Sequence, residues 1–273
     1  MKKLANLKIL LVGCGKMGSA LLNGWIDQNI EGPNICVVEP QNNTLNVFVQ
    51  HGITICNTQQ DLPQDYEPDF IVFAVKPQMM NEIVPTYRCF SENSVFISIA
   101  AGKSISYFEK HLSKQNAIIR AMPNTPAAIG RGITVACGNS SVNKQTQEIC
   151  LALLGSVGKA LWLDDEKLID AVTAISGSGP AYVFLLAEAM VQAGRNAGLN
   201  QNMATELAIN TVAGSGELLQ QSSEKISILR ENVTSPGGTT EAALSVLMGE
   251  NGMQELIGKA VNNAILRSKA LDN

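Results

Sequence analysis

The feature of this sequence that most limits its fold is a series of short apolar runs before residue 164. They are rich in Val, Ile and Phe, and several are apolar at every position, which is typical of strands covered on both faces of a parallel sheet. The predicted strands are 8–12, 34–38, 52–55, 69–75, 94–100, 117–122, 132–137 and 159–163. Amphipathic stretches with the pattern of helices separate them, for example residues 17–28 and 104–112. This alternation predicts an open, doubly wound α/β sheet.

The pattern changes after about residue 164, where strand-like runs stop. The predicted helices are 165–175, 180–197, 201–220, 224–231, 239–248 and 252–270. They are rich in Ala, Gly and Ser, and some of their faces carry few charges, so we expect them to be buried against a second subunit. The sequence therefore predicts two domains, an α/β domain over residues 1–164 and a helical domain over residues 165–273.

Composition narrows the possible partners. The 273 residues give a formal net charge of −4 and contain no cluster of Lys and Arg, so nothing favours binding to nucleic acid. The six cysteines are scattered without a CxxC pair and lie mostly in apolar runs. This spacing favours buried free thiols over disulfides or a metal site.

The first residues allow two interpretations. The letters MKK followed by an apolar run ending at Cys14 resemble an export signal, but Lys8 interrupts the run and leaves only residues 9–12. A signal needs roughly 7–15 apolar residues. No other stretch approaches the ~20 apolar residues of a membrane span, and the best of them, residues 181–187, ends at Glu188. We therefore expect a cytoplasmic protein with no membrane partner.

The second interpretation of the same letters is a glycine loop, Gly13-x-Gly15-x-x-Gly18. It follows a predicted strand, opens a predicted helix, and is followed about 20 residues later by an acid, Glu39. We expect Gly13 to turn the chain, Gly15 to admit a pyrophosphate close to the backbone, and Gly18 to let helix and strand pack closely. The N–H groups that begin the helix would bind the anion. The loop predicts a dinucleotide site, and a tight turn without a ligand is the alternative.

Glu39 bears on which dinucleotide is bound. A carboxylate there accepts hydrogen bonds from the ribose hydroxyls of adenosine but repels a 2′-phosphate. The next residues, 40–43, include no Arg or Lys to bind that phosphate. By this argument the site favours NADH, unless Glu39 points to solvent.

Other loops follow the ends of predicted strands, where doubly wound sheets bind ligands. The stretches 74–77 and 100–102 contain small residues that let a flat ring approach the backbone, and Lys76 is a candidate charge partner for phosphate or substrate. In the helical half, residues 176–180 and 234–240 each precede a helix. The second of these, with its two glycines, suits a carboxylate. Ordinary helix capping is the alternative for both.

Histidine gives no candidate base, since neither His51 nor His111 neighbours one of these loops. Reduction of a ketone, or oxidation of an alcohol, needs an acid or base at the oxygen. Reduction of an imine depends less on such an acid or base, because a protonated imine already carries the positive charge that attracts hydride.

Taken together, the loops resemble the pyrroline-5-carboxylate reductase family over essentially the whole chain. The segments that carry the resemblance are, in order, GCGKMG, FAVKPQ, SIAAG, RAMPNTPAAIGRG, LIDAVTAISGSGPAYVF and NVTSPGGTTEAAL. The resemblance implies reduction of 1-pyrroline-5-carboxylate to L-proline by NADPH or NADH, the last step of proline biosynthesis. It also implies a Rossmann-type doubly wound sheet followed by an all-helical dimerisation domain, as a dimer or a higher homo-oligomer.

The resemblance also implies roles for individual residues. The cofactor would be held by Gly13, Cys14, Gly15, Lys16, Met17, Gly18, Glu39, Asn57, Ala74, Val75, Lys76, Pro77, Ala100 and Ala101. The substrate would be held by Glu166, Asn232, Gly237, Gly238, Thr239 and Thr240. Within the family NADPH is commonly favoured and the position of Glu39 is often small or hydroxylated, so Glu39 departs from that pattern.

For the mechanism, we expect catalysis to be chiefly the positioning of hydride donor and acceptor, which supplies ~7–11 kcal/mol. Thr240 is the expected catalytic residue, hydrogen-bonded to the ring nitrogen. Two alternatives fit parts of the sequence. One is another imine or β-hydroxyacid reductase of the same architecture, although helix 180–197 lacks the lysine that a hydroxyacid enzyme would place there. The other is a non-catalytic dinucleotide-binding regulator, which would not need the loop around Thr240.

Overall fold

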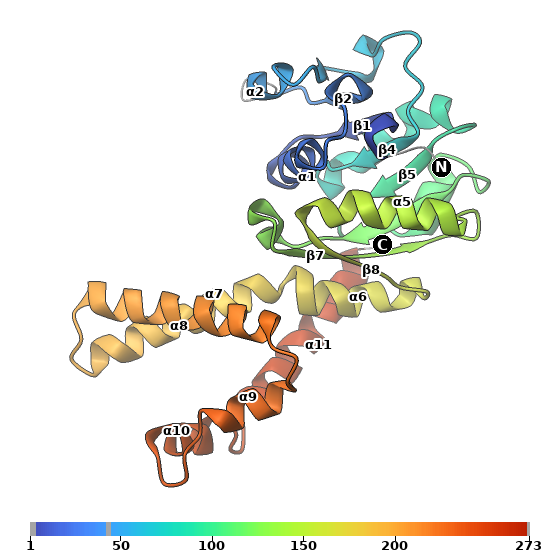
Figure 1. Cartoon of the computed structure of the whole chain (residues 1–273). Coiled ribbons are helices and arrows are strands. Elements are labelled where there is room, and N and C mark those ends of the chain that lie inside the picture. Colours follow the sequence, from blue (N-terminus) through green and yellow to red (C-terminus); the bar gives the residue numbers. More distant parts are fainter. Residues whose placement is uncertain (1–3, 42–44, 272–273) are drawn as a thin grey trace. The chain divides into compact units, whose positions relative to one another are not determined.

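The computed structural model describes residues 4–41 and 45–271 (Figure 1). The chain divides into two compact units, one formed by Met1–Gly177 with Ile265–Asn273 and the other by Ser178–Ala264. This division differs from the predicted boundary at residue 164, because residues 166–177 and the end of the last helix belong with the sheet. The two units are described separately below.

The first unit is built on one sheet of eight strands in the order β3-β2-β1-β4-β5-β6-β7-β8. The strands are β1 Ile9–Val12, β2 Ile35–Val38, β3 Thr54–Cys56, β4 Phe70–Phe73, β5 Val95–Ser98, β6 Ile118–Met122, β7 Gly132–Gly138 and β8 Gly158–Trp162. The strands from β3 to β6 are mutually parallel, and their order turns back on itself between β1 and β4. All eight predicted strands are present, and the Rossmann-type fold class is confirmed.

One pairing differs from the expected parallel sheet, because β7 runs antiparallel to β6. Only residues 123–131 join these strands, and a parallel crossover needs a dozen or more residues. The short turn η6, Thr125–Ile129, fills this connection and ends at Gly130 with φ +69°. The last strand, β8, is parallel to β7.

Helices cover both faces of the sheet. Successive side chains of β1 alternate between two cores, with Ile9 and Leu11 in one and Leu10 and Val12 in the other. Because β1 is covered by an apolar core on each face, every one of its residues is apolar. The helices of this unit are α1 Lys16–Asp27, α2 Asn46–Val49, α3 Met80–Ile83, α4 Ile105–His111, α5 Lys144–Leu154 and α6 Ile169–Val172.

Trp25 of α1 shows how the first core is closed. Its side chain is fully buried, and its indole N–H donates to the carbonyl of Leu153 in α5 at 3.0 Å. Phe108 of α4 plays the corresponding part on the other face, where it stacks on Phe73 of β4 with ring centroids 6.0 Å apart. Trp25 thus links α1 to α5 in one core, and Phe108 packs α4 against the sheet in the other.

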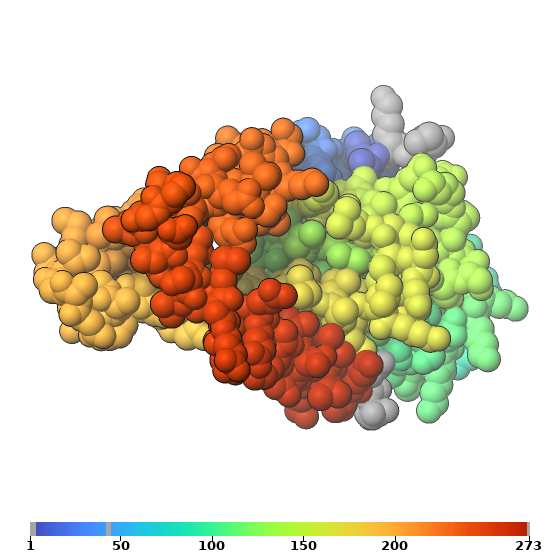
Figure 2. Space-filling view, turned by 90° about the horizontal axis from the view of Figure 1, so that it is seen from below, coloured from blue at the N-terminus to red at the C-terminus, as the bar shows by residue number. Residues whose placement is uncertain are grey.

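The second unit is helical, as expected. Its elements are α7 Gly179–Asn196, α8 Gln201–Gln221, α9 Ile226–Asn232, α10 Thr239–Leu247 and the first part of α11 Met253–Leu271. Helix α7 packs along α8, yet within α8 only the small Ala204 and Ala208 are buried. Large apolar side chains of this unit, among them Phe184 at 62% exposure, lie on its surface, which Figure 2 draws in orange shades.

One helical stretch bears on the expectation that no segment approaches the length of a membrane span. Among the described residues, the helical stretch 166–196 is long and apolar enough to span a bilayer by length and composition. The stretch contains a π-helical turn, Thr173–Gly177. An apolar helix of this length is equally suited to packing against another protein chain, so its composition is weak evidence for a membrane.

Candidate active site

The glycine loop connects β1 to α1 through two close contacts. Gly13 has φ +90°, and a Cβ placed on it would lie 2.6 Å from Cγ1 of Val75. A Cβ on Gly18 would lie 2.5 Å from the carbonyl oxygen of Gly13. Neither position admits a side chain, so these two glycines let the start of α1 pack directly on the loop and on the end of β4.

Gly15 is different, because a Cβ added there meets no heavy atom within 4 Å. It is the N-cap residue of α1, no side chain caps the helix, and both Gly15 and Lys16 are exposed. The first N–H groups of a helix lack partners within the helix and attract anions. The loop therefore leaves open space in front of a helix N-terminus, which fits a pyrophosphate.

Glu39 follows the last residue of β2 and is tied to this loop. Its Oε2 accepts the N–H of Cys14 at 2.8 Å, and its Oε1 accepts the N–H of Gln41 at 3.0 Å. The carboxylate thus does not point away into solvent. Each of its oxygens keeps a further lone pair for a ribose hydroxyl. Of the neighbouring stretch 40–43, residues 42 and 43 lie outside the described residues.

A cavity of about 500 Å³ lies at the carboxyl ends of β1, β2 and β4, which are in register at Val12, Val38 and Phe73. This is the edge at which doubly wound sheets bind nucleotides. Among the residues predicted to bind the cofactor, those that line it are Gly13, Gly15, Glu39, Asn57, Ala74, Val75 and Lys76. Its shape and lining fit a dinucleotide.

The other predicted cofactor residues lie outside this lining. Cys14 is buried beneath the loop, where burial raises the pKa of its thiol, and its Sγ lies 3.4 Å from Oγ of Ser19. Ala100 is buried in the loop after β5. The remaining ones are Lys16, Met17 and Gly18 at the start of α1, Pro77 at the start of the turn η4 Pro77–Met79, and Ala101, half-buried, next to Ala100.

Several other residues line this cavity without having been predicted from the sequence. They are Thr58, Gln59, Gln60, Met79, Glu82, Ile83, Thr86 and Tyr87. A signal for the first of them exists, because Thr58 and Asp61 form a capping box directly after β3. The cavity lining carries two carboxylates, Glu39 and Glu82, against the single ammonium of Lys76. This balance repels an additional phosphate.

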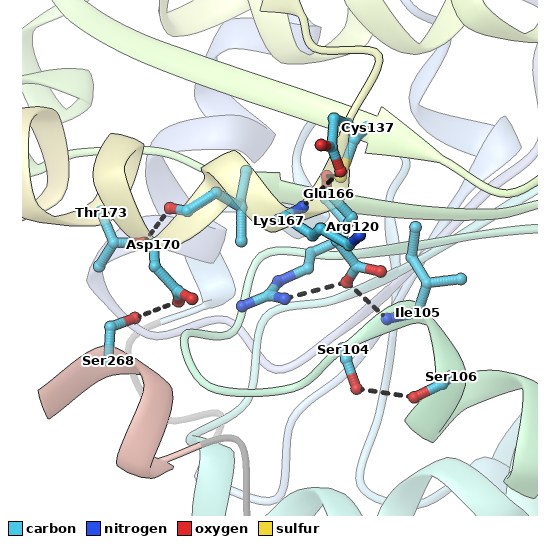
Figure 3. A network of polar contacts seen from close by, with 12 residues as sticks. Ser104, Ile105, Ser106, Arg120, Cys137, Glu166, Lys167, Asp170, Thr173 and Ser268 are labelled. Carbon is cyan, nitrogen blue, oxygen red and sulfur yellow. Dashed lines mark hydrogen bonds and ion pairs between the residues drawn. The ribbon is translucent and has the colours of Figure 1, made fainter. Parts of the chain in front are cut away.

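One carboxylate oxygen of Glu166, a residue expected near the substrate, is engaged by groups of the same chain (Figure 3). Its Oε1 accepts Nη1 of Arg120 at 2.9 Å and the N–H of Ile105 at 2.8 Å. Arg120 lies in β6 with its side chain only 6% exposed, against 29% for that of Glu166. The thiol of Cys137 on β7 is close by, and burial, with a smaller contribution from Glu166, raises its pKa to about 12.

The loop 234–240 precedes α10 in the second unit. Gly237 has φ +69° and donates its N–H to Oε2 of Glu241 at 2.7 Å, while Gly238 donates its N–H to the carbonyl of Ser235 at 2.9 Å. Both N–H groups expected to hold a substrate carboxylate are therefore engaged in this structure. Gly238 is the N-cap residue of α10 and no side chain caps the helix.

The other predicted substrate residues are near the same helix start. Thr239 and Thr240 are the first two residues of α10, the former exposed and the latter half-buried. Asn232, the last residue of α9, donates its Nδ2 to Glu224 at 3.2 Å. Beside them a cavity of about 400 Å³ is lined by Arg230, Glu231, Thr234, Glu241, Leu244, Ser245 and Met248.

The parallel sheet with a reversed strand order, the open glycine loop and the cavity at the strand ends together define the class: a dinucleotide-dependent oxidoreductase. The family model described as "Pyrroline-5-carboxylate reductase dimerisation" matches residues 166–271. The model described as "NADP oxidoreductase coenzyme F420-dependent" matches residues 8–102.

Whole-chain comparisons narrow the class. A pyrroline-5-carboxylate reductase of Pseudomonas aeruginosa is 36% identical, covering 97% of this chain and 96% of its own. One of Arabidopsis thaliana is 35% identical with the same coverage. The structure of a Coxiella burnetii pyrroline-5-carboxylate reductase matches with a TM-score of 0.91 at 32% identity, covering 98% of this chain and 99% of its own. A Plasmodium falciparum pyrroline carboxylate reductase with NADP bound matches with a TM-score of 0.83, the same identity and the same coverage.

This chain belongs to the pyrroline-5-carboxylate reductase family. Its reaction is the reduction of 1-pyrroline-5-carboxylate to L-proline with a hydride from NADPH or NADH, the last step of proline biosynthesis. The assignment confirms the family predicted from the loops and favours this reaction over the β-hydroxyacid and regulator alternatives.

Proposed function

We propose that the first unit holds the dinucleotide and that the loop 234–240 holds the substrate carboxylate. The observation that carries the first part is the space in front of Gly15, where an uncapped helix N-terminus opens beside a cavity of about 500 Å³. The pyrophosphate would lie at Gly13–Gly18, the adenosine ribose at Glu39 and the adenine side near Asn57. The nicotinamide would lie by residues 74–77 and 100–101.

For the carboxylate, the support is a second helix N-terminus without a side-chain cap, that of α10. The N–H groups of Thr239 and Thr240 are in the first turn, where helices bind anions. The N–H of Gly237 becomes available when Glu241 moves away, since that side chain is exposed and holds it by one hydrogen bond. Asn232 would lie beside the pyrroline ring of the substrate.

When bound, NAD(P)H supplies the hydride. The work left to this chain is to hold the imine carbon in line with the donor and to exclude water, which is worth ~7–11 kcal/mol for well-oriented reactants. Thr240 is half-buried in the first turn of α10, next to the N–H groups proposed to hold the carboxylate, and this position suits its hydroxyl as a donor or acceptor for the ring nitrogen. We propose Thr240 as the catalytic residue on this ground.

The experiment is a kinetic comparison of Thr240→Ala with the wild type, using 1-pyrroline-5-carboxylate and NADH or NADPH. We expect kcat/KM to fall about tenfold or more, roughly 1.4 kcal/mol of lost transition-state stabilisation. Thr205→Ala, at a half-buried threonine of α8, is the matched control. A value for Thr240→Ala within about twofold of wild type, under ~0.5 kcal/mol, would show that its hydroxyl takes no part.

The protein is proposed to self-associate as a dimer or a higher homo-oligomer. Support comes from the match to the dimerisation model over residues 166–271 and from the apolar surface of α7, where Phe184 and Leu185 are 62% and 64% exposed. Isolated soluble chains rarely expose large contiguous apolar patches. A cytoplasmic location, and the absence of nucleic-acid and membrane partners, stay predictions.

A further inference from the structure

We propose that Glu166 is a positioning residue that, together with Arg120, fixes the loop 100–104 beside the nicotinamide, and that it is not a substrate ligand. The inference rests on the proposed cofactor site at the strand ends. It is argued from contacts within the first unit, several of which are drawn in Figure 3.

The first contact is the ion pair between Arg120 and Glu166. Arg120 is a charged residue in the middle of an apolar strand, and only 5% of it is exposed. A guanidinium in such a place must be paired, because leaving a buried charge without a partner is strongly unfavourable. Oε1 of Glu166 lies 2.9 Å from its Nη1. The position of Glu166 is therefore fixed from the sheet side.

The second contact connects Glu166 to the loop. Ser104 is the N-cap residue of α4 but makes no capping hydrogen bond, and its Oγ lies instead 3.0 Å from Oγ of Ser106. The same Oε1 of Glu166 accepts the N–H of Ile105 at 2.8 Å and so replaces the missing cap. A carboxylate also stabilises a helix N-terminus through the helix dipole. One end of the loop 100–104 is thus held by Glu166.

A third set of contacts holds the middle of the loop. Gly102 has φ +67°, and a Cβ on it would lie 2.9 Å from Cβ of Leu271 at the end of α11. That helix end is in turn fastened by buried Ser268, whose Oγ donates to Oδ1 of Asp170 at 2.7 Å. Asp170 follows Glu166 by four residues.

The loop is therefore held at two points by one short segment, residues 166–170. Glu166 holds its end directly, and Asp170 holds its middle through α11. Ala100 and Ala101, which we place beside the nicotinamide, lie immediately before Gly102. A change in Glu166 should therefore disturb the nicotinamide end of the cofactor site and leave the phosphate and adenosine ends, which lie on other loops, as they are.

The experiment compares binding of two probes to the full-length protein by calorimetry: NADH, and ADP-ribose, which lacks the nicotinamide. For Glu166→Ala we expect the Kd of NADH to rise by about tenfold, as for loss of a buried charged hydrogen-bond partner, with the Kd of ADP-ribose unchanged. Glu166→Gln keeps an acceptor for Ile105 and should show a smaller rise. Asp164→Asn, which alters an exposed carboxylate nearby, is the control and should change neither Kd.

Two results would overturn the proposal. Equal weakening of both probes would mean that Glu166 merely supports the fold. Unchanged binding of both, with a raised KM for 1-pyrroline-5-carboxylate, would make Glu166 a substrate ligand. If Glu166→Ala does not fold, Ser268→Ala takes its place and must show the same selective loss for NADH. Because neither probe is the substrate, wild-type protein that binds NADH but fails to reduce 1-pyrroline-5-carboxylate would refute the proposed function alone.

Discussion

At the scale of single residues, Glu39 combines one predicted role with one contact that the structure shows. Its place after β2 predicts contact with the ribose, and the structure adds that it also accepts the N–H of Cys14 in the glycine loop. The carboxylate thus helps set the conformation of the loop that we propose as the pyrophosphate site. A substitution at Glu39 should consequently change both which dinucleotide binds and how tightly any dinucleotide binds.

We predict that Glu39→Ser shifts the ratio of kcat/KM for NADPH to that for NADH toward NADPH by about tenfold, roughly 1.4 kcal/mol. The reason is removal of the carboxylate that repels a 2′-phosphate. Kinetics with both cofactors measure the ratio, and Glu82→Gln tests whether the second carboxylate of the cavity contributes. A ratio unchanged in Glu39→Ser would show that Glu39 does not face the ribose.

The ion-pair partner of Arg120 could not be predicted from the sequence. A lone arginine inside the run AIIRAM signals that a buried counter-charge exists, but not which of the acids supplies it. The partner, Glu166, lies 46 positions away in the sequence and comes next to Arg120 only through the packing of η8, Glu166–Leu168, against the sheet. The resemblance implies a place near the substrate for Glu166, which stays a prediction, and a motif gives no information on its contact with Arg120.

At the scale of elements, the predicted strands and the long helices agree with the structure because each carries its own apolar pattern. The apolar pattern of a strand does not indicate the direction in which the strand runs. The antiparallel β7 follows from the length of the connection before it, residues 123–131, which is too short for a crossover. The sequence of the π-helical turn, Thr173–Gly177, likewise has the pattern of an ordinary α-helix. The structure adds a close approach of Gly177 to the side chain of Met122, which the pattern does not indicate.

The connection from β1 to α1 offers a matched pair of substitutions. Gly18→Ala places a methyl 2.5 Å from the carbonyl of Gly13, so we predict a loss of about 1–3 kcal/mol in the free energy of unfolding. Gly15→Ala meets nothing and should keep wild-type stability while raising the Kd of NADH, because the methyl enters the space proposed for the pyrophosphate. Chemical denaturation and calorimetry measure the two effects. Unchanged NADH binding in Gly15→Ala would contradict the placement of the pyrophosphate.

At the scale of the whole molecule, the apolar surface of the second unit predicts its assembly. Phe184→Glu puts a charge on the exposed face of α7, and we expect the protein to dissociate from a dimer or larger oligomer into monomers. Light scattering after gel filtration measures the mass. Ile129→Glu, which charges an even more exposed apolar residue of the first unit, should leave the mass unchanged. An oligomer that survives Phe184→Glu would place the interface elsewhere.

The buried cysteines predict how stability depends on pH. Burial raises the pKa of Cys36 to about 11 and that of Cys137 to about 12, from an ordinary value of 9.0. Above pH 9 the unfolded chain loses these protons first, so the free energy of unfolding should fall as pH rises from about 9 toward these values, by up to about 1.4 kcal/mol per pH unit for each thiol. Denaturation at several pH values measures the slope. Cys36→Ala should reduce it and Cys89→Ala, at an exposed site, should not.

The central claim is that this chain moves a hydride from a nicotinamide to the carbon of an imine bond. The most direct measurement supplies NADH deuterated at the transferred position of C4, with 1-pyrroline-5-carboxylate, and analyses the product by mass spectrometry and NMR. The account predicts L-proline with one deuterium on the carbon that formerly belonged to the imine, in equal amount to the NADH consumed. Proline without the label, or NADH consumption without proline, would contradict it.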